Sequence, residues 1–320
     1  MTQGYHIPAM PDEVMHYLNC RPGKIYVDGT LGGSGHASLI AEKIGPDGLL
    51  IGIDRDTDAL LNAEKVLKPY LSNVRLFHGN YSQLPEFLAE AGIEAVDGIF
   101  LDLGLSFHQI AGSGRGFSFL REEPLDMRMN INNEMTAHDL INGFDTRELA
   151  QIFKKYGEER KAGRIAKAIV SYRQRKTIDS SLELAEIICG TVPKKIRVKQ
   201  KIHPATRVFM AIRIAVNREL EHIEKFMTDV VEKDDGALLN PGARLCILSF
   251  HSLEDRIVKH RIRDMEQSCV CPPKLPGCAC NKKQVLRVLT KKAVGPTVEE
   301  VEINPMARST RLRAAEKHSQ

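Results

Sequence analysis

We predict an α/β fold with a mostly parallel sheet, because short apolar runs alternate with helical patterns and the first run leads into a glycine-rich turn. The gap between the fourth and fifth runs is long enough to hold an inserted helical subdomain. The predicted strands are Lys24–Asp28, Leu49–Asp54, Val74–Phe77, Val96–Leu103, Arg244–Phe250, Val285–Leu289 and Ser309–Arg313.

Only the last part of the long gap is needed for a crossover helix. That helix is predicted to begin at His203-Pro-Ala-Thr and to carry one apolar stripe as far as Val230. Asp145-x-x-Glu148 and Ser180-x-x-Glu183, earlier in the gap, are typical helix starts. We therefore predict one domain made of residues 1–109 and 203–320, with an inserted helical subdomain at 110–202.

The composition is that of an ordinary globular protein, with 42% apolar residues, 27% charged residues and a formal net charge of +4. This charge is too small to indicate a nucleic-acid partner. The N-terminus lacks a basic start followed by an apolar core, and no apolar run approaches membrane-spanning length. We therefore expect a cytoplasmic protein without a membrane partner.

Basic side chains nevertheless crowd the predicted insertion, with only Glu158 and Glu159 close to the first group of them. A charge-rich run is usually a solvated helix face. Together with the glycine-rich turn described next, which fits a nucleoside cofactor, the same run favours the phosphate backbone of a nucleic acid as the partner. The residues are Lys154, Lys155, Arg160, Lys161, Arg164, Lys167, Arg173, Arg175 and Lys176, followed by Lys194, Lys195, Arg197, Lys199 and Lys201.

The turn Asp28-Gly-Thr-Leu-Gly-Gly-Ser-Gly-His36 is the most informative motif. Its glycines allow the backbone to approach a ligand closely, and a helix is expected to begin near Gly35. Asp54 ends the next apolar run, where a carboxylate can accept both hydrogen bonds of a ribose diol. Because the spacing departs from G-x-G-x-x-G, the motif favours S-adenosylmethionine over NAD.

Polar residues also follow the third and fourth runs. In an open parallel sheet, ligands bind outside the carboxyl ends of the strands, so we expect Asp102 and Gln109 to border the glycine-rich turn. Tyr81 is placed where its ring could stack on adenine or face a sulfonium. Ordinary core packing of Tyr81 is the alternative.

Four of the seven cysteines are close together in the sequence, as two C-x-C pairs separated by six residues. Four thiolates could bind zinc, but C-x-x-C is the usual zinc knuckle. A proline-stiffened loop with reduced thiols or a local disulfide is an equally open alternative, so no metal ligand is assigned. The residues are Cys269, Cys271, Cys278 and Cys280.

The chain contains VDGTLGGSGH, PLDMRMN and HPATRVFMAIRIAVNREL, among other motifs. These resemble the motifs of the ribosomal RNA small subunit methyltransferase H family, the MraW-type enzymes. The resemblance implies a Rossmann-like, S-adenosylmethionine-dependent methyltransferase domain interrupted by a helical RNA-recognition insertion. It also implies methylation of the exocyclic N4 amine of a cytidine in the decoding region of 16S rRNA, with the small ribosomal subunit as partner. The motifs are HIPAMPDEV, VDGTLGGSGH, GIDRD, LDLGLS, RGFSF, PLDMRMN, YGEERKAGRIAKAIV, HPATRVFMAIRIAVNREL, SFHSLEDRIVK and NPMARSTRLR.

The resemblance also implies a set of cofactor contacts: Ser34, Gly35, His36, Asp54, Tyr81, Asp102 and Gln109. Ser34 stands where the family commonly has glycine, and Tyr81 where it commonly has phenylalanine. Phe107-His108 replaces a common Ser-Pro, and Asn130 replaces the usual aspartate of its motif. These departures put the loop geometry and any charge-dependent role of residue 130 in question.

The expected reaction needs a hydrogen-bond acceptor for a weakly nucleophilic cytosine amine. We assign this catalytic role to Asp102 as a hypothesis, in addition to its cofactor contact. Ser249-Phe250-His251-Ser252 follows the fifth run and could meet the base, with Phe250 stacking on it. Core packing is the alternative for Phe250. The target base must leave its stack to reach the site.

Other classes of protein remain alternatives at this point. The strongest is a non-catalytic RNA-binding ribosome-assembly factor on a methyltransferase-like scaffold, because fold alone does not prove chemistry. An NAD-dependent oxidoreductase lacks a convincing pyrophosphate turn. A DNA amino-methyltransferase would have a Pro-Pro-aromatic motif where this chain has Asp102-Leu-Gly-Leu. The sequence leaves both a monomer and a homodimer open.

Overall fold

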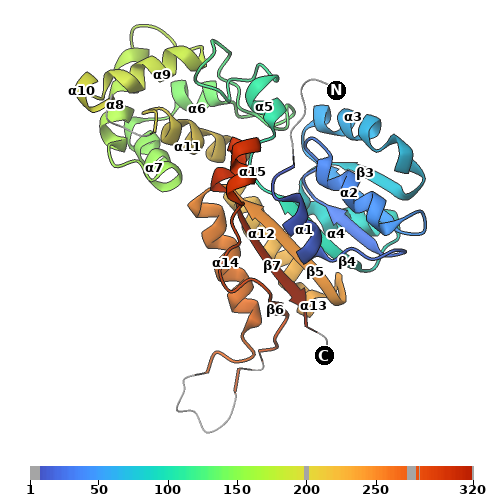
Figure 1. Cartoon of the computed structure of the whole chain (residues 1–320). Helices are drawn as coiled ribbons and strands as arrows, with labels where there is room; N and C mark the ends of the chain where they lie inside the picture. Colours follow the sequence, from blue (N-terminus) through green and yellow to red (C-terminus); the bar gives the residue numbers. More distant parts are fainter. Residues whose placement is uncertain (1–7, 198–201, 272–278, 281, 319–320) are drawn as a thin grey trace. The chain divides into compact units, whose positions relative to one another are not determined.

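The computed structural model describes residues 8–197, 202–271, 279–280 and 282–318 of the chain. They form two compact units, whose helices and strands are labelled in Figure 1. The sheet unit is the described part of Tyr5–Leu105 and Leu220–Gln320, and the helical unit is Ser106–Glu219 without its undescribed residues. Within the described residues, no helix combines the length and the apolar character needed to span a membrane.

The sheet unit contains a seven-stranded sheet in the order β3-β2-β1-β4-β5-β7-β6. Neighbouring strands from β3 to β5 are parallel, whereas β7 is antiparallel to both β5 and β6. All seven predicted strands are present, although β7 begins and ends later than predicted. The strands are β1 (Ile25–Asp28), β2 (Leu49–Asp54), β3 (Val74–His78), β4 (Val96–Asp102), β5 (Leu239–Ser249), β6 (Leu286–Val288) and β7 (Arg311–Lys317).

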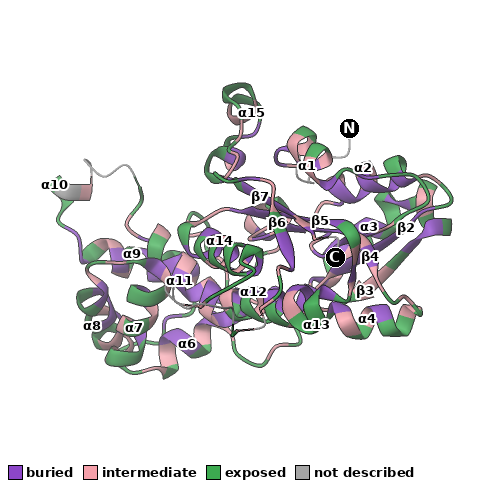
Figure 2. Cartoon of the chain, turned by 90° about the horizontal axis from the view of Figure 1, so that it is seen from below, coloured by how far each residue is buried: buried purple, intermediate pink, exposed green. Residues whose placement is uncertain are grey.

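Helices cover both faces of this sheet, because successive strand residues point to opposite sides and both sides are apolar. Tyr26, Leu50 and Phe100 share one buried cluster with α1 and α2. Val27 and Ile51 share another with α4, α12 and α14, and Figure 2 shows this burial along the strands. The helices are α1 (Pro11–Leu18), α2 (Gly35–Ile44), α3 (Thr57–Val66), η1 (Lys68–Asn73), η2 (Tyr81–Gln83), α4 (Leu84–Ala91), α12 (Glu219–Phe226), η3 (Met227–Glu232), α13 (Lys233–Gly236), α14 (Ser252–Glu266), α15 (Val298–Ile303) and η4 (Pro305–Ser309).

The helical unit confirms the helix starts predicted within the long gap. Asp145 accepts hydrogen bonds from two backbone N–H groups of α7, and Glu148 accepts one from the N–H of Asp145. Ser180 accepts a hydrogen bond from the N–H of Glu183 at the start of α9. The helices are α5 (Phe107–Ala111), α6 (Ala137–Gly143), α7 (Thr146–Gly157), α8 (Ala162–Arg173), α9 (Ser181–Gly190), α10 (Lys194–Arg197) and α11 (Thr206–Asn217).

The predicted single crossover helix from His203 to Val230 is wrong. It is interrupted after α11 at Arg218, whose φ of 50° lies in the left-handed region. The helical unit keeps α11, because Gly157 allows close packing of α7 against it: a Cβ on Gly157 would lie 2.6 Å from the carbonyl oxygen of Arg207. The compact helical unit is therefore wider at both ends than the predicted insertion at 110–202.

Candidate active site

Three neighbouring parallel strands each end on an aspartate: Asp28 on β1, Asp54 on β2 and Asp102 on β4. In the sheet, β1 lies between β2 and β4, with Asp28 opposite Gly52 on one side and Phe100 on the other. This is the position where the strand order reverses, and open α/β sheets bind ligands at the carboxyl ends of such strands. The three carboxyl groups therefore belong to one sheet edge. Sequence reasoning chose Asp54 and Asp102 but missed Asp28, although its place at the end of an apolar run was a usable signal.

Hydrogen bonds connect the glycine-rich turn to both neighbouring strand ends. The hydroxyl of Thr30 accepts a 2.6 Å hydrogen bond from the backbone N–H of Asp102. The N–H of Gly32 donates to Asp54 Oδ2 at 2.9 Å, and the N–H of Thr30 donates to Asp28 Oδ1 at 3.0 Å. The turn is thus held against the ends of β1, β2 and β4, as the site prediction requires.

The first glycine of the turn allows a close approach to the next strands. A Cβ on Gly29 would lie 2.4 Å from Leu101 Cδ2 and 2.9 Å from the Cβ of Tyr81. Tyr81 is only 5% exposed, and its ring makes an edge contact with Phe226 at 5.6 Å between centroids. Tyr81 therefore borders the turn and packs in the core, while its proposed contact with adenine stays a prediction.

The helix α2 begins directly after the turn, as expected. Ser34, its N-cap, has a φ of 63°, a left-handed conformation that glycine adopts with less strain. Pro8 covers Gly35, whose added Cβ would meet the proline ring at 3.0 Å. The next residue, His36, hydrogen-bonds through Nε2 to the carbonyl of Ala9, and its Nδ1 lies 3.8 Å from Asp102 Oδ2. The structure therefore brings the start of α2 to the end of β4.

Two polar atoms at this edge are buried and lack a hydrogen-bond partner among the described residues: Ser34 Oγ and Asp102 Oδ1. Buried polar groups are nearly always hydrogen-bonded in native proteins, because an unsatisfied one is destabilising by about 1–3 kcal/mol. Asp54 also has lone pairs left after accepting hydrogen bonds from Gly32 and Asp56. These groups fit a polar ligand that donates hydrogen bonds.

Burial shifts the pKa of all three carboxyl groups upward. It raises the pKa of Asp28 to about 7, with a smaller contribution from the charge of Asp54. The pKa of Asp102 is raised well above its usual value by burial, then by the charges of Asp28 and Glu254. The pKa of Asp54 is raised mainly by burial. When the carboxyl groups are ionised, they repel one another. A bound cation would relieve this repulsion between carboxylates, so the edge favours a positively charged ligand.

Gln109 belongs to the helical unit. It is buried in α5, where its side-chain oxygen accepts a hydrogen bond from the N–H of Ser106 at 3.1 Å. The Ser106 hydroxyl in turn accepts from the N–H of Gln109 at 3.2 Å, which completes a helix cap. The cap is one established role of Gln109, and its predicted cofactor contact stays a prediction.

The segment after β5 places an aromatic ring beside the loop that follows β4. Phe250 is partly buried, and a Cβ on Gly104 would lie 3.4 Å from its ring. The backbone N–H of Phe250 donates a 2.9 Å hydrogen bond to Glu254 Oε2, in the first turn of α14. Phe250 therefore packs in part against the core, as its alternative interpretation held, and keeps part of its surface exposed.

Phe250 and His251 are among the residues that line a basic cavity of about 740 Å³. No acidic side chain occurs among the described residues that line it. Arg311 and Arg313 are paired with Asp255. Sequence reasoning assigned RNA contacts to the insertion and missed this cavity, because its cations come from four separate segments. They are Lys259, Arg263, Lys291, Lys292, Arg308, Arg311 and Arg313.

The doubly wound sheet, the glycine-rich turn and the acidic edge are typical of the class of α/β proteins that bind a nucleoside cofactor. A model of the MraW methylase family matches residues 3–318. The chain is 53% identical to the ribosomal RNA small subunit methyltransferase H of Desulfosudis oleivorans over 312 residues, which cover 98% of each chain. It is 54% identical to the same-named protein of Desulforapulum autotrophicum over 310 residues, covering 97% and 98%. The chain belongs to the MraW methylase family.

Family membership confirms the predicted methyltransferase class, its Rossmann-like fold and S-adenosylmethionine as the cofactor. Among solved structures, an rRNA methylase from Streptococcus thermophilus is similar at 12% identity and a TM-score of 0.39, covering 97% of this chain and 94% of that one. The acidic edge fits the cofactor: Asp54 has acceptors for ribose hydroxyls, and the buried Ser34 Oγ and Asp102 Oδ1 are free to bind polar groups.

The acidic edge also predicts a pH-dependent preference for a positively charged donor. Burial raises the pKa of Asp28 from 3.8 to about 7, so this carboxyl group loses its proton as the pH rises through 7. The protonated form favours the folded state, and this contribution to stability is lost above that pH. The ionised form then attracts a sulfonium. We expect S-adenosylmethionine to bind about tenfold more tightly at about pH 8 than at about pH 6.

Thermal shifts and calorimetry at the two pH values measure this effect. S-adenosylhomocysteine is the matched control, because it lacks the sulfonium charge but keeps the ribose and the amino-acid part. Its pH dependence should be clearly smaller. Equal pH dependence for the two ligands would rule out an electrostatic role of the acidic edge.

Proposed function

We propose that this protein uses S-adenosylmethionine to methylate the exocyclic N4 amine of a specific cytidine in the decoding region of 16S rRNA. The observation that carries the proposal is near-full-length similarity to proteins named ribosomal RNA small subunit methyltransferase H. Support comes from an acidic, partly unsatisfied edge beside the glycine-rich turn, where a methyl donor can bind. The partner is then 16S rRNA or the small ribosomal subunit, and the expected location is the cytoplasm.

The bound donor would supply an activated methyl group on a positively charged sulfur. Asp102 is proposed to accept a hydrogen bond from the cytosine amine, which would make the nitrogen lone pair more available, and then to accept its proton. Burial raises the pKa of Asp102, which makes its carboxylate a stronger base than an exposed one. Thr30 holds the backbone of Asp102 through its hydroxyl, which limits the positions that the carboxylate can take. Asp54 is proposed to bind the ribose.

The RNA is proposed to bind through the basic cavity and the helical unit. Phe250 is among the residues that line the cavity, so phosphates bound there would bring a flipped-out base close to an aromatic ring on which it can stack. In the helical unit, Lys154, Lys155 and Arg164 are exposed and available to phosphates. Arg173, by contrast, donates hydrogen bonds to backbone carbonyls within that unit. Lys199 and Lys201 lie outside the described residues.

Mass mapping of small-subunit rRNA tests the proposed function. RNA from cells lacking the protein should miss one cytidine methyl group, and the wild-type gene should restore it. The Asp102→Asn variant, expressed at the same level, should not. An unchanged methylation map in the deletion strain would refute the proposal. If the map is unchanged while ribosome assembly fails, the non-catalytic assembly factor is the better account, and calorimetry should then detect no donor binding.

The basic cavity gives a separate prediction about RNA affinity. Replacing Lys291 and Lys292 together with alanine removes two cations that line the cavity. We expect RNA affinity to fall about tenfold at ~0.15 M salt, with the slope of log K against log salt reduced by about two. Filter binding across a salt series measures both values.

The Lys154→Ala, Lys155→Ala double variant is the matched comparison, because it removes the same charge from the helical unit. Donor affinity should be unchanged in both double variants. If the cavity variant keeps wild-type affinity and salt slope, the cavity does not hold the RNA backbone. Light scattering of the same samples distinguishes a monomer from a homodimer, both of which the sequence leaves open.

A further inference from the structure

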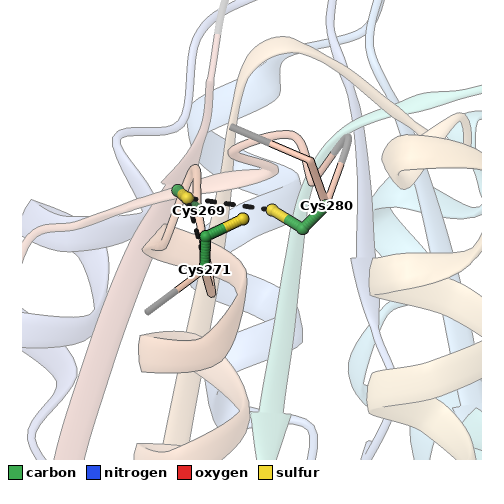
Figure 3. Close-up of side chains that lie close together, drawn as sticks. All are labelled: Cys269, Cys271 and Cys280. Atoms are coloured by element: carbon green, nitrogen blue, oxygen red, sulfur yellow. Dashed lines mark hydrogen bonds between the residues drawn. The ribbon is translucent and has the colours of Figure 1, made fainter. Parts of the chain in front are cut away.

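Three cysteines gather in the segment between α14 and β6, outside the acidic edge and the basic cavity. Cys269, Cys271 and Cys280 place their Sγ atoms within 4.8 Å of one another. Figure 3 shows the three side chains turned toward one another from the two sides of the segment. Cys278, the fourth cysteine of the sequence motif, lies outside the described residues.

Each of the three sulfur atoms accepts a backbone hydrogen bond. The N–H of Cys271 points to Cys269 Sγ at 3.4 Å, and the N–H of Val270 points to Cys280 Sγ at 3.4 Å. The N–H of Ala279 points to Cys271 Sγ at 3.3 Å. These hydrogen bonds hold the three sulfur atoms in their positions beside one another. Thiolate is the form that binds metals.

The distance between the sulfurs distinguishes a metal site from a disulfide. Cys269 Sγ and Cys280 Sγ are 3.8 Å apart. Sulfurs bound at about 2.3 Å in a tetrahedral zinc site are about 3.8 Å apart, whereas a disulfide joins them at about 2.05 Å. The spacing therefore matches two vertices of a tetrahedron around a zinc-sized ion.

We propose that Cys269, Cys271 and Cys280 bind a zinc ion through three thiolates, with one further ligand completing its tetrahedron. Soft thiolate ligands select zinc over hard cations such as magnesium. The ion would connect the two sides of the segment between α14 and β6. The ends of this segment are already hydrogen-bonded to each other: the N–H of Val285 donates to the carbonyl of Met265, and the N–H of Val288 donates to Glu266 Oε1. This inference goes beyond the proposed function and is independent of it.

Metal analysis of the purified full-length protein tests the proposal. Untagged protein, purified under reducing conditions and given zinc chloride before gel filtration, should retain about one zinc ion per chain. Cys271→Ser should retain less than about a fifth of that amount. Cys189→Ser is the matched control and should keep its full zinc content, because Cys189 does not belong to the group of three cysteines. Its Sγ lies 3.6 Å from His203 Nε2 instead.

Cobalt substitution of the wild-type protein gives a second measurement that does not depend on variants. Cobalt(II) chloride should produce the intense visible absorption of a tetrahedral site and the near-ultraviolet charge transfer of cobalt–thiolate bonds, and zinc should abolish both. Unchanged donor binding by Cys271→Ser would show that its loss of zinc is not a loss of fold. Wild-type protein that retains no zinc and gives no cobalt–thiolate band would overturn the proposal. So would a Cys269–Cys280 disulfide found by mass spectrometry in the protein purified under reducing conditions.

Discussion

Asp102→Asn is expected to lower the rate of methyl transfer by about 10²–10⁴-fold, the usual contribution of a positioned general base. Asparagine has nearly the same shape as aspartate but cannot take the proton from the cytosine amine. The hydrogen bond from the backbone N–H of Asp102 to the Thr30 hydroxyl does not involve the side chain of Asp102, so the strand end should keep its position. Single-turnover methylation of small-subunit RNA at saturating donor measures the effect.

Asp97→Asn is the matched control for this variant, because Asp97 lies earlier on β4 and accepts hydrogen bonds from Asn240 and the N–H of Ile25. It should keep the wild-type rate within about threefold. Binding of S-adenosylhomocysteine to Asp102→Asn then separates a lost proton acceptor from a lost cofactor site. A rate for Asp102→Asn equal to that of the wild type would exclude the assigned catalytic role.

Asp54→Ala is expected to weaken S-adenosylmethionine binding by about 10²–10⁴-fold. The carboxylate accepts hydrogen bonds from the N–H groups of Gly32 and Asp56, both at 2.9 Å, and its remaining lone pairs are available to the ribose. Alanine would remove the two charge-assisted hydrogen bonds proposed between Asp54 and the ribose, each contributing about 1.5–3 kcal/mol. It also releases the glycine-rich turn. Calorimetric titration with the donor measures the loss.

Asp47→Ala provides the control, because Asp47 is an exposed acidic residue just before the other end of β2. Its donor affinity should match that of the wild type. Asp54→Asn should lie between the two variants, since an amide keeps one acceptor oxygen. Donor binding by Asp54→Ala within about threefold of wild type would show that the ribose is bound elsewhere.

The sheet was predictable because its signals are local. Apolar runs of strand length alternate with helical patterns, and all seven predicted runs are strands in the structure. The glycine-rich turn was equally readable, since Gly29 has no room for a side chain between Leu101 and Tyr81. The helix caps at Asp145 and Ser180 depend on residues two or three positions away, which sequence patterns record directly.

Features that depend on distant segments were missed or misplaced. The apolar stripe after His203 continues through Arg218, so periodicity alone could not show that the helix is interrupted there. Packing of α11 against α7 at Gly157 decides where the helical unit ends. The basic cavity combines cations from α14, the loop after β6, η4 and β7, and no single segment is basic enough to indicate it.

The amino-acid sequence by itself determined the strand and helix order, the turn that begins the cofactor site, and the family to which the chain belongs, because all of these depend on residue types at short, fixed spacings. Only the tertiary structure decided that Asp28 joins Asp54 and Asp102 at one buried edge, and that three cysteine sulfurs meet. Strand order, burial and distances between sulfurs arise from packing of segments far apart in the chain. The raised pKa values of the carboxyl groups follow from this packing, so no pattern along the sequence indicates them.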